Sequence, residues 1–298
     1  MIAETRGDLG QAPNFLPARE PQSTMPTTPT TPTTPTTPYA PRTTASTRTT
    51  PSVSRVKLVD LALPHPRLRL EQDDEWAVVR QGTQWTRIRL HDYDAVFAIP
   101  GLYDLWIYDV LGCTSPRRVR LLLDRALADA GVDPAGLTVL DLGAGNGCVA
   151  EELARSGITR FVGVDIAPQA AVAAGRDRPD RYLDYVVCDL TDLDGADGRR
   201  LAKFRFNALT CVAALGFGDV PPDVFTAALR LLDPSSWVAF TLKTEFAEDA
   251  SLSPFATLVK SLDERGELRI VARENYVHRR NSAGDAIQYT AFVARTKV

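Results

Sequence analysis

The feature that most constrains the fold of this chain is the stretch Thr138-Val-Leu-Asp-Leu-Gly-Ala-Gly-Asn-Gly-Cys148. It begins with five residues typical of a buried strand and breaks at three glycines, Gly143, Gly145 and Gly147. A helical pattern of apolar and polar residues follows. A strand, a glycine turn and a helix in this order open a nucleotide-binding α/β fold, because glycine lets the chain turn tightly and lets a ligand lie against its backbone.

Composition separates an N-terminal tail from the rest of the chain. Residues 1–54 are dominated by Thr, Ser and Pro, with a Pro-Thr-Thr repeat between Pro26 and Pro38. Such a segment has too little apolar surface to offset its ordering entropy, so we expect it to be disordered. We favour a dispensable extension over a tether or docking tail, and Met25 is an alternative start to Met1.

Charge and cysteine content narrow the class of protein. The net charge of −3 over 298 residues gives no electrostatic footprint for nucleic acid or an anionic membrane. No apolar run approaches the roughly 20 residues that span a bilayer, and the N-terminus lacks a signal-peptide core. The four cysteines form no CxxC pair, and no histidine stands at metal-ligand spacing. We therefore expect reduced thiols, no metal and a cytoplasmic location.

Strand and helix patterns alternate from residue 137 onward. This alternation predicts a parallel sheet covered on both faces, and a short turn near Asn281 predicts a closing antiparallel hairpin. The predicted fold class is therefore α/β, a doubly wound Rossmann-like sheet of seven strands, five of them parallel. The predicted strands are 138–142, 161–166, 185–188, 206–212, 237–242, 268–277 and 287–294. We assign residues 136–298 to this domain.

We expect residues 55–135 to form a smaller region that caps the core or acts as a lid. Its most distinctive part is 91–111, which is rich in aromatic residues and is broken once by Pro100-Gly101. We expect two short helices there. The other predicted elements are two strands (75–80 and 86–90) and a helix with Ser115 as N-cap, Pro116 in its first turn and Gly131 at its end.

The glycine turn differs from two common nucleotide-binding motifs. A dinucleotide fingerprint has its third glycine three residues after the second, where this chain has Cys148. A phosphate-binding loop needs Gly-Lys-Ser/Thr, and this turn contains no lysine. A turn that presents its backbone without a cation suits a ligand that is not polyanionic.

Acidic residues stand at three successive strands. Asp141 precedes the turn, Asp165 ends the second strand and Asp189 follows the third. The carboxyl ends of adjacent parallel strands share one edge of the sheet, where ligands bind. Asp165 can accept from both hydroxyls of a ribose, Asp189 from an adenine amino group, and Asp141 can hold an ammonium directly or through water. Together they predict a ligand with a cationic amino-acid end, a ribose and an adenine.

Three motifs resemble the cofactor motifs of class I S-adenosylmethionine (SAM) methyltransferases: Val139-Leu-Asp-Leu-Gly-Ala-Gly-Asn-Gly147, Val164-Asp-Ile166 and Cys188-Asp-Leu190. The similarity runs from about residue 137 to the C-terminus. Within the class, Thr241-Leu-Lys-Thr-Glu-Phe246 and Glu274-Asn-Tyr-Val-His278 resemble the small Williams–Beuren-type methyltransferase-like group. The resemblance implies a methyltransferase with SAM as cofactor. The cofactor-binding residues that we expect are Tyr93, Asp141, Gly143, Ala144, Gly145, Asn146, Gly147, Asp165, Ile166, Asp189, Leu190 and Cys211.

The methyl acceptor is expected above the carboxyl ends of the fourth and fifth strands. The fourth strand lacks the Asn/Asp-Pro-Pro-Tyr/Phe motif of amino-methylating DNA enzymes, and the chain has no basic stripe, which argues against DNA. The segment 91–111 is the expected pocket wall, although we expect three of its five aromatics (Tyr93, Phe97, Tyr103, Trp106 and Tyr108) only to pack against the sheet. The candidate substrate-binding residues are Tyr103, Tyr108, Phe217 and Lys243.

A catalytic base is optional, because methyl transfer is an in-line displacement on an already activated sulfonium. The candidates are His91, His278 and Glu245, since histidine titrates near neutral pH. The leading interpretation is methyl transfer to O or N of a small molecule, in a pocket between the core and the aromatic cap. A protein methyltransferase recruited through the tail and a SAM-binding protein without turnover are the alternatives. The oligomeric state is left open.

Overall fold

The computed structural model describes residues 59–215 and 220–297, which all belong to one unit of the chain, Ser54–Val298. The expected disorder of residues 1–54 and the candidate Phe217 lie outside the described residues. Within the described ranges, no helix is both long enough and apolar enough to cross a lipid bilayer.

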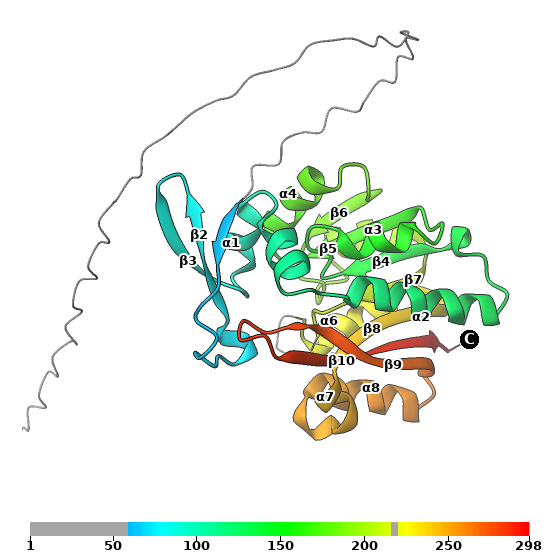
Figure 1. Cartoon of the computed structure of the whole chain (residues 1–298). Helices are drawn as coiled ribbons and strands as arrows, with labels where there is room; N and C mark the ends of the chain where they lie inside the picture. Colours follow the sequence, from blue (N-terminus) through cyan, green and yellow to red (C-terminus); the bar gives the residue numbers. More distant parts are fainter. Residues whose placement is uncertain (1–58, 216–219, 298) are drawn as a thin grey trace, which may run out of the picture. The chain divides into compact units, whose positions relative to one another are not determined.

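Within these ranges, the core is a seven-stranded sheet in the order β6-β5-β4-β7-β8-β10-β9 (Figure 1). The first five strands in this order are parallel, and β10 pairs antiparallel with both β8 and β9. This confirms the predicted fold class. The strands are β4 (Thr138–Leu142), β5 (Arg160–Asp165), β6 (Asp184–Val187), β7 (Phe206–Cys211), β8 (Leu232–Lys243), β9 (Leu268–Arg280) and β10 (Ala286–Thr296).

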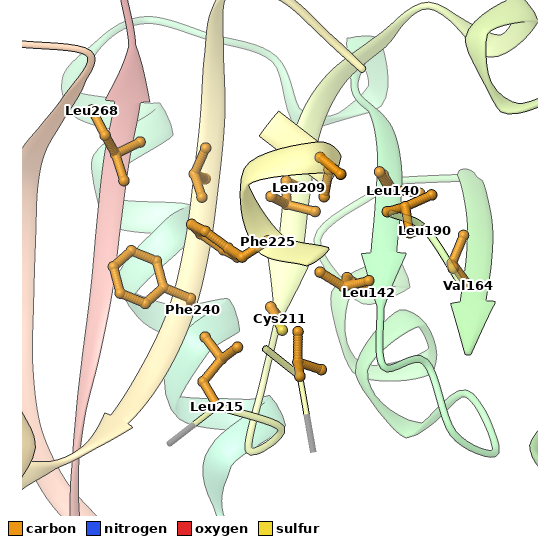
Figure 2. Close-up of a cluster of buried hydrophobic side chains, with 14 of the residues drawn as sticks. Leu140, Leu142, Val164, Leu190, Leu209, Cys211, Leu215, Phe225, Phe240 and Leu268 are labelled. Atoms are coloured by element: carbon orange, nitrogen blue, oxygen red, sulfur yellow. The ribbon is translucent and has the colours of Figure 1, made fainter. Parts of the chain in front are cut away.

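Helices cover both faces of this sheet, because side chains alternate between the faces along each strand. Leu140 and Leu142 of β4 belong to a buried cluster with Phe225 and Phe255 on one face, part of which Figure 2 shows. Val139 belongs to a second cluster with α2 and α3 on the other face. The helices are α2 (Ser115–Asp129), α3 (Cys148–Ala154), α4 (Pro168–Asp177), α5 (Ala196–Leu201), α6 (Pro222–Arg230), α7 (Thr244–Glu248) and α8 (Pro254–Glu264).

The N-terminal part of the described chain forms a separate antiparallel sheet with two short helices after it. The strands are β1 (Asp60–Ala62), β2 (Trp76–Gln81) and β3 (Gln84–Arg89), and the helices are α1 (Tyr93–Ala98) and a π-helix (Asp104–Val110). We call α1, the π-helix and the residues between them the cap. The two predicted strands and the two predicted helices are confirmed, whereas β1 was not predicted.

Some local predictions are wrong. Thr114, and not Ser115, is the N-cap of α2. The Ser115 hydroxyl instead bonds to Tyr276 Oη at 2.6 Å and to His278 Nδ1 at 2.7 Å, so it ties the start of α2 to β9. Neither α5 nor α7 was predicted, because both helices are too short to show a clear apolar period.

Candidate functional site

The three glycines of the turn between β4 and α3 adopt left-handed backbone conformations, with φ of 68°, 54° and 89° at Gly143, Gly145 and Gly147. A Cβ atom on Gly143 would lie 3.0 Å from Ala214 Cβ, and one on Gly145 would lie 3.2 Å from the Phe97 ring. The turn therefore requires glycine both for its conformation and for space.

Asp165 lies at the end of β5 beside this turn. Its Oδ2 accepts a hydrogen bond from Gly145 N at 2.9 Å, and its Oδ1 accepts one from Ala167 N at 3.0 Å. Burial raises the pKa of this carboxyl group, although the backbone hydrogen bonds oppose the shift. A carboxylate has about four acceptor sites, so Asp165 keeps capacity for two further donors such as ribose hydroxyls. This is the role that the sequence predicts for it.

Asp141 has a different environment. Thr210 Oγ1 donates to its Oδ1 at 2.7 Å, and Tyr182 Oη donates to its Oδ2 at 2.8 Å. Burial raises the pKa of this carboxyl group to about 6. Among the described residues, Asp141 is not part of the lining of either pocket described below. Both of its oxygens are engaged by protein side chains, and its role in binding an ammonium remains a prediction.

A first pocket, which we call the strand-end pocket, opens along the carboxyl ends of the parallel strands. Gly143, Gly145, Asp165, Asp189 and Leu190 line it, which brings together predicted residues from three strands. Ile166, also predicted, lines it and is 69% exposed. The strand-end pocket thus lies where a parallel sheet binds ligands.

Asp189 stands on the exposed rim of this pocket. Its Oδ1 accepts hydrogen bonds from Thr191 N at 3.0 Å and from Thr191 Oγ1 at 2.9 Å, and these bonds lower the pKa of the carboxyl group. Its second oxygen is the one left to accept from a ligand. The predicted contact with an adenine amino group remains a prediction.

A second pocket, which we call the cap pocket, lies between the cap, the glycine turn and the C-terminal hairpin. His91, Tyr103, Tyr108, Cys148 and His278 all line it. It shares several wall residues with the strand-end pocket: Tyr93, Tyr103, Gly143, Gly145, Val212 and Ala213. The two pockets therefore meet at the glycine turn.

The five cap aromatics are placed differently from our expectation. Tyr93, Phe97, Tyr103 and Tyr108 each line one or both pockets, whereas Trp106 is 1% exposed and lines neither of them. We expected three of the five only to pack against the sheet, and this was wrong. Four of the five cap aromatics therefore line a pocket.

The predicted bases fall into two groups. His91 and His278 both line the cap pocket. Glu245 instead forms an ion pair with Lys243 after β8, and within the described residues neither side chain lines the cap pocket or the strand-end pocket. Cys211, expected near the cofactor, is fully buried in the core and also lines neither pocket.

An ionic cluster links the cap to the glycine turn. Asp104 of the π-helix accepts from Asn146 Nδ2 at 2.9 Å and from Arg178 Nη2 at 3.1 Å. Arg178 Nη1 donates to the Asn146 carbonyl at 3.2 Å, and the Arg178 side chain is only 10% exposed. The predicted residue Asn146 thus bonds to the cap. Asp104 and Arg178 were not predicted, because no local pattern connects residues that lie this far apart in the sequence.

Comparison with known proteins agrees with this geometry. Residues 140–240 match a family model described as a methyltransferase domain, the segment that holds the glycine turn, Asp165 and Asp189. Residues 140–240 are a class I SAM-dependent methyltransferase domain. SAM is the cofactor of this methyltransferase domain, and the strand-end pocket fits it, with a hydrogen-bond acceptor for the ribose at Asp165 and a glycine turn that leaves room for a ligand.

Curated relatives match only part of this chain. Ubiquinone biosynthesis O-methyltransferase of Thiobacillus denitrificans is 31% identical over 109 residues, which are 36% of this chain and 44% of that protein. The enzyme of the same name from Paracidovorax citrulli is 32% identical over 114 residues, 36% of this chain and 43% of that protein. The chain therefore spans less than half the length of these relatives.

A solved structure of N-methyltransferase NodS from Bradyrhizobium japonicum, in complex with S-adenosyl-L-homocysteine (SAH), is 16% identical to this chain. The match covers 68% of this chain and 96% of that one, with a TM-score of 0.49. The finer resemblance to the Williams–Beuren-type group is not tested by these relatives and stays a prediction.

Proposed function

We propose that the protein transfers the methyl group of SAM to an oxygen or nitrogen atom of a small molecule held in the cap pocket. The observation that carries this proposal is the shared wall of the two pockets at Tyr93, Tyr103, Gly143 and Gly145. A ligand in the strand-end pocket and a ligand in the cap pocket would meet at the glycine turn, as an in-line displacement requires.

The residues of the chain have distinct roles in this proposal. Bound SAM supplies an electrophilic methyl group on a sulfonium. Asp165 accepts hydrogen bonds from the ribose, and the turn at Gly143 and Gly145 lets the cofactor lie close to the backbone. Tyr93 and Tyr103 line both pockets, and their rings would exclude water from the place where the two ligands meet, which favours attack by an acceptor over side reactions with water.

We place the activity in the cytoplasm, in keeping with four free thiols, all within the described residues. Residues 55–135 would form the substrate-covering region and residues 136–298 the methyltransferase domain. Nucleic acid is not proposed as the acceptor, nor an anionic membrane surface as a partner, because the net charge of −3 offers them no attraction. The names of the curated relatives, ubiquinone biosynthesis O-methyltransferases, favour a small-molecule acceptor.

The proposal is tested by incubating the protein with methyl-labelled SAM and an extract of its source organism, followed by separation by size. We expect label in the small-molecule fraction, and the same yield after deletion of residues 1–54. Label in protein bands, lost on that deletion, would instead support a protein methyltransferase. Tight SAM binding without any labelled product would support a SAM-binding protein without turnover.

A further inference from the structure

The cap pocket is poorly suited to a cationic acceptor. Among the described residues, no aspartate or glutamate lines it, whereas Arg279 does. The Arg279 side chain is 3% exposed and forms an ion pair with Glu75 at 2.6 Å, but Glu75 is not part of the lining. Burying an ammonium without a carboxylate partner is costly, and a sulfonium in the neighbouring pocket would repel it further. An uncharged acceptor avoids both costs.

One side chain of this pocket is arranged to receive a proton. His278 Nδ1 lies 2.7 Å from Ser115 Oγ, which lies 2.6 Å from Tyr276 Oη. The imidazole stacks on the Tyr289 ring with centroids 4.1 Å apart. Because Nδ1 is engaged, and because Nε2 has no hydrogen-bond partner in residues 59–215 or 220–297, Nε2 is the nitrogen left for a ligand.

Resting on the proposed function, we propose that the acceptor is a hydroxyl compound and that His278 Nε2 takes its proton. The hydroxyl oxygen forms a bond to the methyl carbon while the carbon–sulfur bond breaks, and the electron pair of that bond stays on sulfur. The O–H electron pair stays on oxygen, and the proton passes to Nε2. The resulting imidazolium releases this proton to solvent before the next turnover.

This assignment fixes the direction of the hydrogen-bond chain. For Nε2 to be an acceptor, Nδ1 must carry the hydrogen and donate it to Ser115 Oγ, which then donates to Tyr276 Oη. Ser115 is thus a positioning residue, whose hydroxyl accepts from Nδ1 in the tautomer that the proposal requires.

The charges around His278 suit this role. Burial and Arg279 lower the pKa of the imidazole well below its usual value, so it is neutral and able to accept at pH 7. Cys113 Sγ lies 3.7 Å from Nδ1, but burial raises the pKa of this thiol to about 11, so it brings no charge. Burial also raises the pKa of Tyr276, so this phenol is neutral near pH 7. The positive charge that the imidazole gains replaces the one that the sulfonium loses, so the two pockets together keep their total charge.

His91 is less suited, although it lines the same pocket. Its Nδ1 lies 3.7 Å from Asp73 Oδ1, on a side chain that is about half exposed. His278 is instead buried, and its Nδ1 lies 2.7 Å from Ser115 Oγ, so its position in the pocket is fixed by the fold. His278 is therefore our choice as the proton acceptor.

The first test combines kinetics with binding. His278→Gln should lower kcat by about 100-fold or more, while calorimetry should give an affinity for SAM within about twofold of the wild type. Ser115→Ala should lower kcat and move the acid limb of the pH–rate profile, because the tautomer is no longer held. Thr114→Ala is the matched control, because the Thr114 hydroxyl donates to the Val277 carbonyl and takes no part in the Tyr276–Ser115–His278 hydrogen bonds. This variant should leave kcat and the pH–rate profile unchanged. Unchanged kcat in His278→Gln would overturn the proposal.

The second test needs no turnover. Nitrogen-15 NMR of the histidines in the SAH complex should show His278 with its hydrogen on Nδ1, and a hydrogen on Nε2 would overturn the proposal.

The labelled products provide the third test, because a methylated hydroxyl is not retained by a cation exchanger at acid pH, whereas a methylated amine is. Retained label would overturn the hydroxyl acceptor but leave methyl transfer intact, and the absence of labelled small molecules would overturn both.

Discussion

The strand-end pocket and the cap pocket lie side by side but are built in different ways. About half of the residues that line the strand-end pocket come from three short runs within 142–145, 164–167 and 188–190, each at the end of a parallel strand. The cap pocket draws on Gln72, Tyr103, Cys113 and His278, which are spread over about two-thirds of the chain. A site for the methyl donor that follows from local backbone geometry is easy to recognise in a sequence. A site for the methyl acceptor that is assembled from distant side chains is specific to this protein.

The forces that hold the two pockets together differ in the same way. At the glycine turn, Gly143 N and Ala144 N donate to the Val164 carbonyl at 2.9 and 3.1 Å. The walls of the cap pocket depend instead on ion pairs between side chains, Glu75 with Arg279 and Asp104 with Arg178. Substitutions on the cap side should therefore change stability, and substitutions at the turn should change cofactor affinity.

The largest effect is expected for Glu75→Ala. The Glu75 side chain is 1% exposed, and its loss leaves a guanidinium buried without its partner and removes the acceptor of the Ser282 amide. The free energy of unfolding in urea should fall by about 3–5 kcal/mol. The matched control is Arg69→Ala, which breaks an exposed pair with Asp285 and should cost less than about 1 kcal/mol. Equal losses in the two variants would show that the cap pocket does not depend on the buried pair.

The next effect concerns pH and Asp141. Its folded pKa is raised from 3.8 to about 6, so between these values only the folded chain holds the proton, and the free energy of unfolding should fall as pH rises through this window. Two pKa units correspond to roughly 3 kcal/mol. Asp141→Asn should remove this contribution, which is read as the difference between the urea stabilities of variant and wild type from pH 4 to pH 7.

Taking the difference is necessary because His278 acts with the opposite sign. Its folded pKa is lowered, so the unfolded chain takes up a proton at a higher pH than the folded chain does, and stability falls as pH falls below about 6.5. The prediction for Asp141 is contradicted if the stability difference between Asp141→Asn and wild type stays constant over the whole pH range.

The smallest effect on stability is expected at the glycine turn. Gly143→Ala places a side chain in a left-handed conformation and a Cβ 3.0 Å from Ala214 Cβ, which should cost about 1–2 kcal/mol and lower SAM affinity about tenfold. Gly175→Ala in α4 is the control, because its Cβ would meet nothing within 4 Å. It should raise stability by up to about 1 kcal/mol and leave affinity unchanged. A SAM affinity equal to that of the wild type in Gly143→Ala would show that the glycine at this turn is not needed for cofactor binding.

The sequence predicted the fold and the strand-end pocket well for a physical reason. A buried strand, a left-handed glycine turn and an acid at the next strand end are each determined by a few adjacent residues, and parallel strands bring their ends together without further information. Thus Gly143, Asp165 and Asp189 line one pocket as expected.

The cap pocket was predicted less well, because its contacts are long-range. Nothing near Ser115 in the sequence indicates that its hydroxyl bonds to β9 instead of capping α2. Lys243 ends β8 and Glu245 follows it at the expected edge, yet they pair with each other, and within the described residues neither lines the pocket. A strand-end position alone does not reveal whether a side chain lines a pocket.

The central claim is that Asp165 holds the ribose of SAM in the strand-end pocket. Calorimetry should compare SAH with its 2′,3′-dideoxy counterpart on the wild type and on Asp165→Asn, a variant that keeps an acceptor for Gly145 N. We predict that the wild type binds SAH about 10- to 100-fold more tightly than the dideoxy compound, and that the variant loses most of this preference. An Asp165→Asn protein that binds SAH as tightly as the wild type, with the same preference, would contradict the account.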